Sequence, residues 1–245
     1  MKKWLASLSS AILIHLPGFQ DSPTFVLNAI AIKASRMTEA SSTLATGLVA
    51  FYPFNGNAKD QSGNGHHATV HGAQLTADRS GNAERAYRFD GVDDYLAVNN
   101  FPVLDNTFTY AAWLQVTGQA QHHQSFGAHG EGGAVGETWN FGCNSFYKYW
   151  DMFDRTNRTW QVGMEICSNW THVAIVYDKT ERRIYVNGRL AGTQPITTPI
   201  AHGTSSTLRI GTLVPGDQQF GGAIDDVRIY NRALAVSEIR QIYFR

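Results

Sequence analysis

The stretch FGGAIDDVRIYNRAL, residues 220–234, decides the fold. It holds two short runs, residues 220–224 and 227–230, that are rich in β-branched, aromatic and small residues. Such residues suit a pleated, half-buried strand surface, and each run is too short for a stable helix. We therefore expect two strands here, close to the end of the chain.

Runs of the same kind fill the chain upstream. Tight-turn signals follow some of them, as at Asp90-Gly91 and Asn187-Gly188. The intervening segments lack the helical spacing of a parallel βαβ sheet. The sequence therefore predicts an all-β, two-sheet antiparallel sandwich, with further strands at residues 48–52, 68–70, 86–89, 95–98, 108–116, 160–166, 171–177, 182–186 and 208–211.

One segment has helical spacing. Residues 235–242 place Val236, Ile239 and Ile242 on a single face. We expect a short C-terminal helix that packs this face on the edge of the sandwich.

Composition excludes several classes of partner. Hydrophobic residues make up 43% of the 245 residues, which is enough for a full core and argues against disorder. Lysine plus arginine and aspartate plus glutamate both number 20, so the formal net charge is zero. Without a basic excess we expect no nucleic-acid partner and no attraction to an anionic membrane.

The N-terminal residues differ in composition from the rest. Lys2 and Lys3 precede an apolar run at residues 4–16, which is shorter than the ~20 residues that span a bilayer. We interpret residues 1–34 as a signal peptide or N-terminal anchor, residues 35–46 as a linker and residues 47–245 as one domain. The expected location is secreted or cell-surface, extracellular or periplasmic, with no membrane span in the mature chain.

The two cysteines are Cys143 and Cys167. In an exported protein an even count predicts one disulfide between them. Two buried free thiols are the alternative if the chain stays in the cytosol.

Three ordered blocks of sequence carry a family resemblance. The blocks are GLVAFYPFNGNAKD (47–60) with SGNG (62–65) and YRFDGVDDY (87–95), then WTHVAIVYD (170–178) with IYVNG (184–188), then IG (210–211) with FGGAIDDVRIYNRAL (220–234). Together they resemble the laminin G-like jelly roll of the concanavalin A-like lectin/glucanase superfamily. The resemblance implies a jelly-roll sandwich over nearly all of residues 47–243, but the fold hosts many functions.

The resemblance also implies a structural calcium ion near one edge of the sandwich. Calcium prefers several oxygen ligands from carboxylates, amide side chains and backbone carbonyls. The predicted ligands are Asp60, Gly63 and Asn64 from the first loop and Asp225 from the last block. In the alternative, Asp60 and Asn64 only cap turns and Asp225 pairs with an arginine.

The middle of the chain is dense in aromatic residues. Sugar rings stack their apolar faces on aromatic rings, while amide, carboxylate and guanidinium groups bind their hydroxyls. About half of the aromatic residues in an alternating strand must point into the core instead. The predicted ligand-binding residues are Trp139, Asn140, Asn144, Tyr147, Tyr149, Trp150, Asp151 and Arg155.

The same region contains His122, His123 and His129. Histidines could bind zinc or copper, but no carboxylate or cysteine stands at tight spacing to them. We therefore interpret all three as residues of a solvated loop.

Catalysis finds little support in the sequence. The glucanase relatives of this fold carry a Glu-x-Asp-x-(x)-Glu run on one strand, and this chain has none. We predict a non-catalytic, lectin-like module whose partner is a glycan or polysaccharide. Two alternatives stay open: an extracellular protein–protein adhesion module, and a small polysaccharide-active enzyme, either a glycoside hydrolase or a lyase that uses Tyr147, His129 and Arg155.

Overall fold

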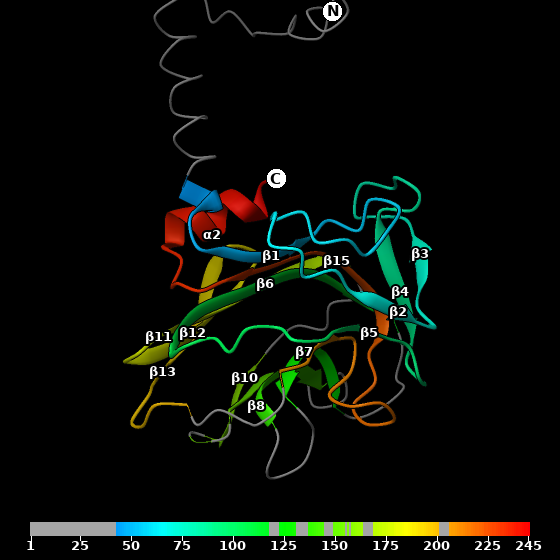
Figure 1. Ribbon diagram of the computed structural model, residues 1–245. Helices are drawn as coiled ribbons and strands as arrows, with labels where there is room; N and C mark the ends of the chain where they lie inside the picture. Colours follow the sequence, from blue (N-terminus) through cyan, green and yellow to red (C-terminus); the bar gives the residue numbers. More distant parts are fainter. Residues whose placement is uncertain are drawn as a thin grey trace, which may run out of the picture. The chain divides into compact units, whose positions relative to one another are not determined.

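The computed structural model describes residues 43–117, 123–130, 137–144, 149–154, 156, 158–163, 169–200 and 206–245. These residues form two antiparallel sheets that face each other, which confirms the predicted jelly-roll sandwich (Figure 1). The prediction for residues 1–34 and most of the predicted linker lie outside the described residues. Thr43–Ala45 form a helical turn, and Leu44 is buried, so the compact unit begins slightly before residue 47.

Sheet A is built around two long central strands, β6 (Thr107–Val116) and β15 (Gly221–Tyr230). Strand β1 (Leu48–Tyr52) pairs with β15 as well. The remaining path runs from β6 through β11 (Thr171–Asp178) and β12 (Glu181–Val186) to β13 (Arg189–Pro195), and from β15 through β4 (Ala86–Asp90) to β3 (Gln74–Thr76).

Sheet B contains three strands between residues 124 and 154, where no strand was predicted. Its order is β10 (Arg158–Gly163), β9 (Tyr149–Asp154), β8 (Glu137–Asn144), β7 (Gln124–Gly130), β14 (Leu208–Ile210), β5 (Tyr95–Val98) and β2 (Thr69–His71). The predicted strand at 160–166 is observed two residues earlier, and residues 164–166 lie outside the described part.

The core lies between the sheets. Phe108, Tyr110, Ala112 and Leu114 alternate along β6 and are fully buried. Sheet B contributes large rings opposite them: Phe108 stacks on Trp139 at 5.7 Å between centroids. Alternate residues of β6 therefore point into the core between the sheets.

A buried ion pair ties the two sheets together. Arg182 of β12 donates from Nη1 to Asp154 Oδ2 of β9 at 2.8 Å, and both side chains are 0% exposed. The Tyr177 hydroxyl donates to the same oxygen at 3.2 Å. Burial of two charges is tolerated here because their remaining atoms also find partners, such as Gln194.

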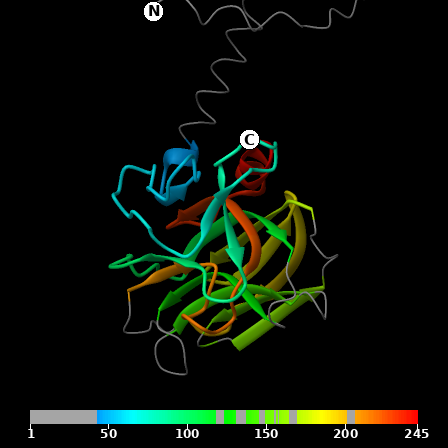
Figure 2. The same cartoon turned by 90° about the vertical axis from the view of Figure 1, so that its right-hand side faces the viewer.

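The predicted C-terminal helix is α2 (Val236–Tyr243). Ile239 and Ile242 are fully buried against sheet A, together with Ala174, Val176 and other apolar side chains of its outer face. Figure 1 shows α2 on one side of β6 and β15, with β7, β8 and β10 on the other; Figure 2 shows α2 (red) next to the first described residues (blue). The helix therefore covers the outer face of sheet A.

Candidate functional site on the outer face of sheet B

Strand β9 turns alternate side chains to solvent. Trp150, Met152 and Asp154 of β9 point inward and are fully buried, whereas Tyr149, Asp151 and Phe153 are partly exposed on the outer face. No helix of the described residues packs on this outer face. The outward side chains of β9 are therefore in part accessible to solvent.

A glycine opens space on this face. Gly142 of β8 lies between Asp151 of β9 and Ser125 of β7 in the strand register. A β-carbon at Gly142 would lie 2.6 Å from Asp151 Oδ1 and 2.8 Å from the Gln124 carbonyl oxygen. The absence of a side chain lets Asp151 lie across β8 toward the start of β7.

Asp151 reaches His123 there. The distance from Asp151 Oδ2 to His123 Nδ1 is 3.0 Å, and the Tyr149 hydroxyl lies 3.5 Å from His123 Nε2. A neutral ring protonated on Nδ1 donates to the carboxylate and accepts from the tyrosine. The hydrogen bond to Asp151 raises the pKa of His123, and the charge of Asp217 adds to the effect.

Asp151 also holds an unsatisfied acceptor. Its Oδ1 is buried and has no hydrogen-bond partner among the described residues, although Oδ2 is paired with His123. A buried carboxylate oxygen without a donor is costly and calls for an explanation, such as a partner that arrives with a ligand.

A second set of hydrogen bonds links Ser125, Asn140 and Gln218. Ser125 Oγ donates to Asn140 Oδ1 at 2.6 Å, and Asn140 Nδ2 donates to Gln218 Oε1 at 2.9 Å. Gln218 belongs to the loop before β15, and its carbonyl accepts from the Ser125 N–H. We call the whole set the polar strip: His123, Ser125, Asn140, Tyr149, Asp151 and Gln218.

The polar strip contains three of the predicted ligand-binding residues, Asn140, Tyr149 and Asp151. The prediction of exposed stacking platforms is wrong for Trp139 and Trp150, which are 0% exposed because strand alternation turns them into the core. Asn144 is also 0% exposed, at the end of β8 opposite Tyr149. Tyr147 and Arg155 lie outside the described residues.

Sequence reasoning missed Ser125 and Gln218, and it placed His123 only in a solvated loop. The only sequence signal is the polar alternation His123-x-Ser125 just before and within β7. His129 was expected in a solvated loop, and this is wrong: it lies in β7, is 0% exposed and stacks on Trp139 at 5.7 Å. His122 lies outside the described residues.

Cys143 is buried on the inward side of β8. Cys167 lies outside the described residues, so a disulfide between the two stays a prediction.

The two predicted calcium-binding carboxylates have partners within the chain. The Asp60 carboxylate accepts from Phe51 N at 2.9 Å, Ser62 N at 2.8 Å, Ser62 Oγ at 2.8 Å and His66 N at 3.0 Å. These four hydrogen bonds fold the first loop and lower the pKa of Asp60 despite its burial. The carboxylate is thus engaged by donors rather than presented to a cation.

The other predicted ligands also have contacts within the chain. Asn64 Nδ2 donates to the Leu48 and Val49 carbonyls, both at 2.9 Å. Gly63 is exposed next to it. Asp225 pairs with Arg79 at 3.1 Å. Asp60 therefore caps turns and Asp225 binds an arginine, so neither predicted carboxylate is presented to calcium.

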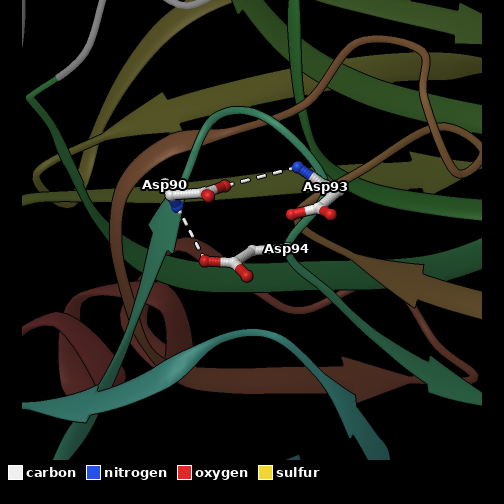
Figure 3. A group of neighbouring side chains, drawn as sticks. All are labelled: Asp90, Asp93 and Asp94. Atoms are coloured by element: carbon white, nitrogen blue, oxygen red, sulfur yellow. Dashed lines mark hydrogen bonds between the residues drawn. The ribbon is translucent and has the colours of Figure 1, made fainter.

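Three other carboxylates come together at the β4–β5 turn. Asp90, Asp93 and Asp94 place ligand atoms within 4.8 Å of one another (Figure 3). Asp90 Oδ1 accepts from the Val92 and Asp93 N–H groups, and Asp94 Oδ2 accepts from the Asp90 N–H at 2.9 Å. The cluster is explained by closure of the turn.

Comparisons with solved structures agree with this fold. Domain 4 of AbnA, an extracellular arabinanase from Geobacillus stearothermophilus solved with arabinotriose, is 18% identical over 80% of this chain and 98% of that chain, with a TM-score of 0.65. The botulinum neurotoxin serotype D binding domain is 16% identical over 82% of this chain, with a TM-score of 0.63. A Trypanosoma rangeli sialidase is 18% identical over 89%, with a TM-score of 0.59.

This chain covers only 52% of the neurotoxin chain and 38% of the sialidase chain. At these identities the likeness concerns the fold. A search of curated proteins found no significant match. No helix among the described residues has the length and apolar character of a membrane span.

The family model of the concanavalin A-like lectin/glucanases superfamily matches residues 90–240, more than half of the sequence. The match includes β6 to β15 and the polar strip. The chain therefore belongs to the laminin G-like branch of the concanavalin A-like lectin/glucanase superfamily.

Proposed function

We propose that this protein is a secreted or cell-surface, non-catalytic carbohydrate-binding module, and that the polar strip on sheet B is its glycan site. The observation that carries the proposal is the Tyr149–His123–Asp151 arrangement, in which Tyr149 and His123 are partly exposed. The solved structure of a similar domain with arabinotriose supports it at the level of the fold.

The chemistry of the strip suits a sugar. The partly exposed Tyr149 ring offers an apolar face to the C–H groups of a pyranose or furanose. Asp151, Asn140 and His123 offer acceptors and donors for hydroxyl groups. The strip has no arginine or lysine among its members, which favours a neutral glycan over an acidic one.

One observation favours a second function. A histidine held between a carboxylate and a tyrosine hydroxyl is also an arrangement for proton transfer. Such a group could serve a polysaccharide lyase, so cleavage has to be measured along with binding.

The test is a panel of neutral and acidic oligosaccharides and polysaccharides, including arabinotriose, scored by calorimetry for binding and by product analysis for cleavage. We expect binding of a neutral glycan and no unsaturated products or new reducing ends. Cleavage would replace the proposal with the enzymatic function, and a panel without any binder would reject both.

A matched pair of variants locates the site. Tyr149→Ala should lower the affinity about tenfold or more, since it removes a stacking ring. Tyr95→Ala is the control, because Tyr95 is also a partly exposed tyrosine of sheet B but lies on β5 and stacks on His71 at 4.3 Å. Equal losses for both variants would contradict the assignment to the polar strip.

A further inference from the structure

Strand β15 is irregular at Asp225, which is one of the predicted calcium ligands. Its register to β6 shifts between Asp225 and Arg228, and Asp226 has a φ of 52°. A positive φ is unfavourable for a residue with a side chain, so such a bulge marks a local requirement. In a regular strand, Asp225 and Asp226 would face opposite sides of the sheet.

The bulge brings both carboxylates to one guanidinium. Arg79 Nη1 lies 3.1 Å from Asp225 Oδ2 and 3.0 Å from Asp226 Oδ2. The other two oxygens are also engaged: Asp225 Oδ1 accepts from the Asp226 N–H at 2.6 Å, and Asp226 Oδ1 lies 3.2 Å from Arg228 Nη2. All four carboxylate oxygens therefore face donors of the chain itself.

Arg79 comes from a distant part of the chain. It lies in the turn between β3 and β4, and its guanidinium carbon lies 4.6 Å from the centre of the Trp113 ring of β6. The Arg79 side chain is 19% exposed and the Asp225 side chain only 4%. The contact thus closes the β3–β4 turn over the outer face of sheet A in a largely desolvated place.

The two aspartates need a positive charge at this place. The two carboxylates lie close together around one guanidinium nitrogen, and the Asp225 side chain is only 4% exposed, so without a cation their charges would repel each other with little screening by water. A bridging divalent cation would be one way to neutralise such a pair. A guanidinium with fixed N–H directions is another.

We propose that Arg79 is a built-in cation that takes the place of a metal ion at this edge, so that the fold of this protein is independent of calcium. This inference does not depend on the proposed glycan site. It predicts that Arg79, and not an ion, holds the β3–β4 turn to β15.

The test measures melting temperature for the whole protein, first with EDTA and then with millimolar Ca²⁺. The wild-type melting temperature should be the same in both. A wild-type melting temperature that falls in EDTA and returns with Ca²⁺ would overturn the inference.

Variants separate charge from packing. Arg79→Met keeps a long side chain over Trp113 but leaves two carboxylates without their cation, so the melting temperature should fall by roughly 5–10 °C. Millimolar Ca²⁺ should restore part of that loss in Arg79→Met only. Arg79→Lys should lose less than Arg79→Met, because it keeps the charge but not the fork geometry.

A double variant guards against a purely steric explanation. Arg79→Met with Asp225→Asn removes one of the two repelling carboxylates and should recover part of the melting temperature. If the double variant is no more stable than Arg79→Met, and Ca²⁺ stabilises neither, Arg79 acts through packing alone and the inference fails.

Discussion

The two sheets use their outer faces in opposite ways. On sheet A, α2 buries an apolar face that includes Ile239 and Ile242. On sheet B, the outer face carries the polar strip and no helix of the described residues covers it. Each outer face contains a histidine, and the two histidines differ in burial and in the direction of their pKa shift.

His172 lies on the covered face and is 1% exposed. Burial, with the positive charges of Arg228 and Arg79, lowers its pKa to about 3. His123 lies on the open face with 42% of its side chain exposed, and Asp151 raises its pKa. Burial thus accompanies a lowered histidine pKa on sheet A, and exposure beside a carboxylate accompanies a raised one on sheet B.

The largest expected effect comes from breaking the covered face. Ile242→Ala leaves a cavity between α2 and sheet A and should lower the free energy of unfolding by about 2–5 kcal/mol. Denaturant unfolding measures this loss. Glycan affinity of the folded variant should be unchanged, and a matching loss of affinity would show that the two faces are not separate.

The covered histidine should appear in the pH dependence of stability. Because the pKa of His172 is lowered in the folded state, its contribution is fully present above the unfolded pKa of about 6.5 and is lost as pH falls toward 3. The slope from this one proton is at most about 1.4 kcal/mol per pH unit. Denaturant unfolding between pH 7 and 4 should show a shallower slope for His172→Gln than for the wild type.

Asp225 has the opposite effect on stability over part of this range. Because its pKa is raised in the folded state, its contribution to stability grows as pH falls. Its contribution is present in both proteins, so the difference between the two curves isolates His172. Parallel curves would show that His172 is not buried in its neutral form.

A smaller change should affect only the open face. Gly142→Ala places a methyl group against Asp151 Oδ1 and the Gln124 carbonyl, which forces one of them to move. We expect the pKa of His123 to fall back toward its ordinary value and glycan affinity to drop several-fold. NMR titration of the His123 ring and calorimetry measure the two effects.

Gly163→Ala is the matched control for that change. Gly163 ends the neighbouring strand β10, and a β-carbon there meets nothing within 4 Å. If the control lowers affinity as much as Gly142→Ala, the position of Asp151 does not determine binding.

The smallest effect concerns the open histidine itself. The raised pKa of His123 keeps its ring protonated to a higher pH than usual, and deprotonation frees Nε2 to accept from Tyr149. Glycan affinity of the wild type should therefore change between pH 6 and pH 8, and the affinity of His123→Asn should not. A flat wild-type profile would remove His123 from the binding site.

The sequence predicted the elements whose patterns are local. The predicted strand at residues 108–116 is confirmed by β6, and the predicted helix at 235–242 by α2. Of the predicted helix face, Ile239 and Ile242 are buried, whereas Val236 is 40% exposed. Residues 221–230 form one strand where two were expected, because the bulge at Asp225 and Asp226 keeps the strand paired through an irregularity.

The region around the polar strip was harder to predict for a physical reason. All residues of β7 are buried. Its polar residues therefore do not mark a solvent-facing side of the strand. The contact of His123 with Asp151 crosses β8 and depends on the missing side chain of Gly142. Likewise, the pairing of Arg79 with Asp225 joins residues that only the tertiary fold brings together.

The most direct test of the account follows backbone amide chemical shifts as the tightest-binding oligosaccharide of the panel is added. The account predicts shifts at Ser125, Asn140 and Asp151 on sheet B, and none at Ile239 and Ile242 of α2. Shifts confined to α2 and the outer face of sheet A, with the polar strip unchanged, would contradict it.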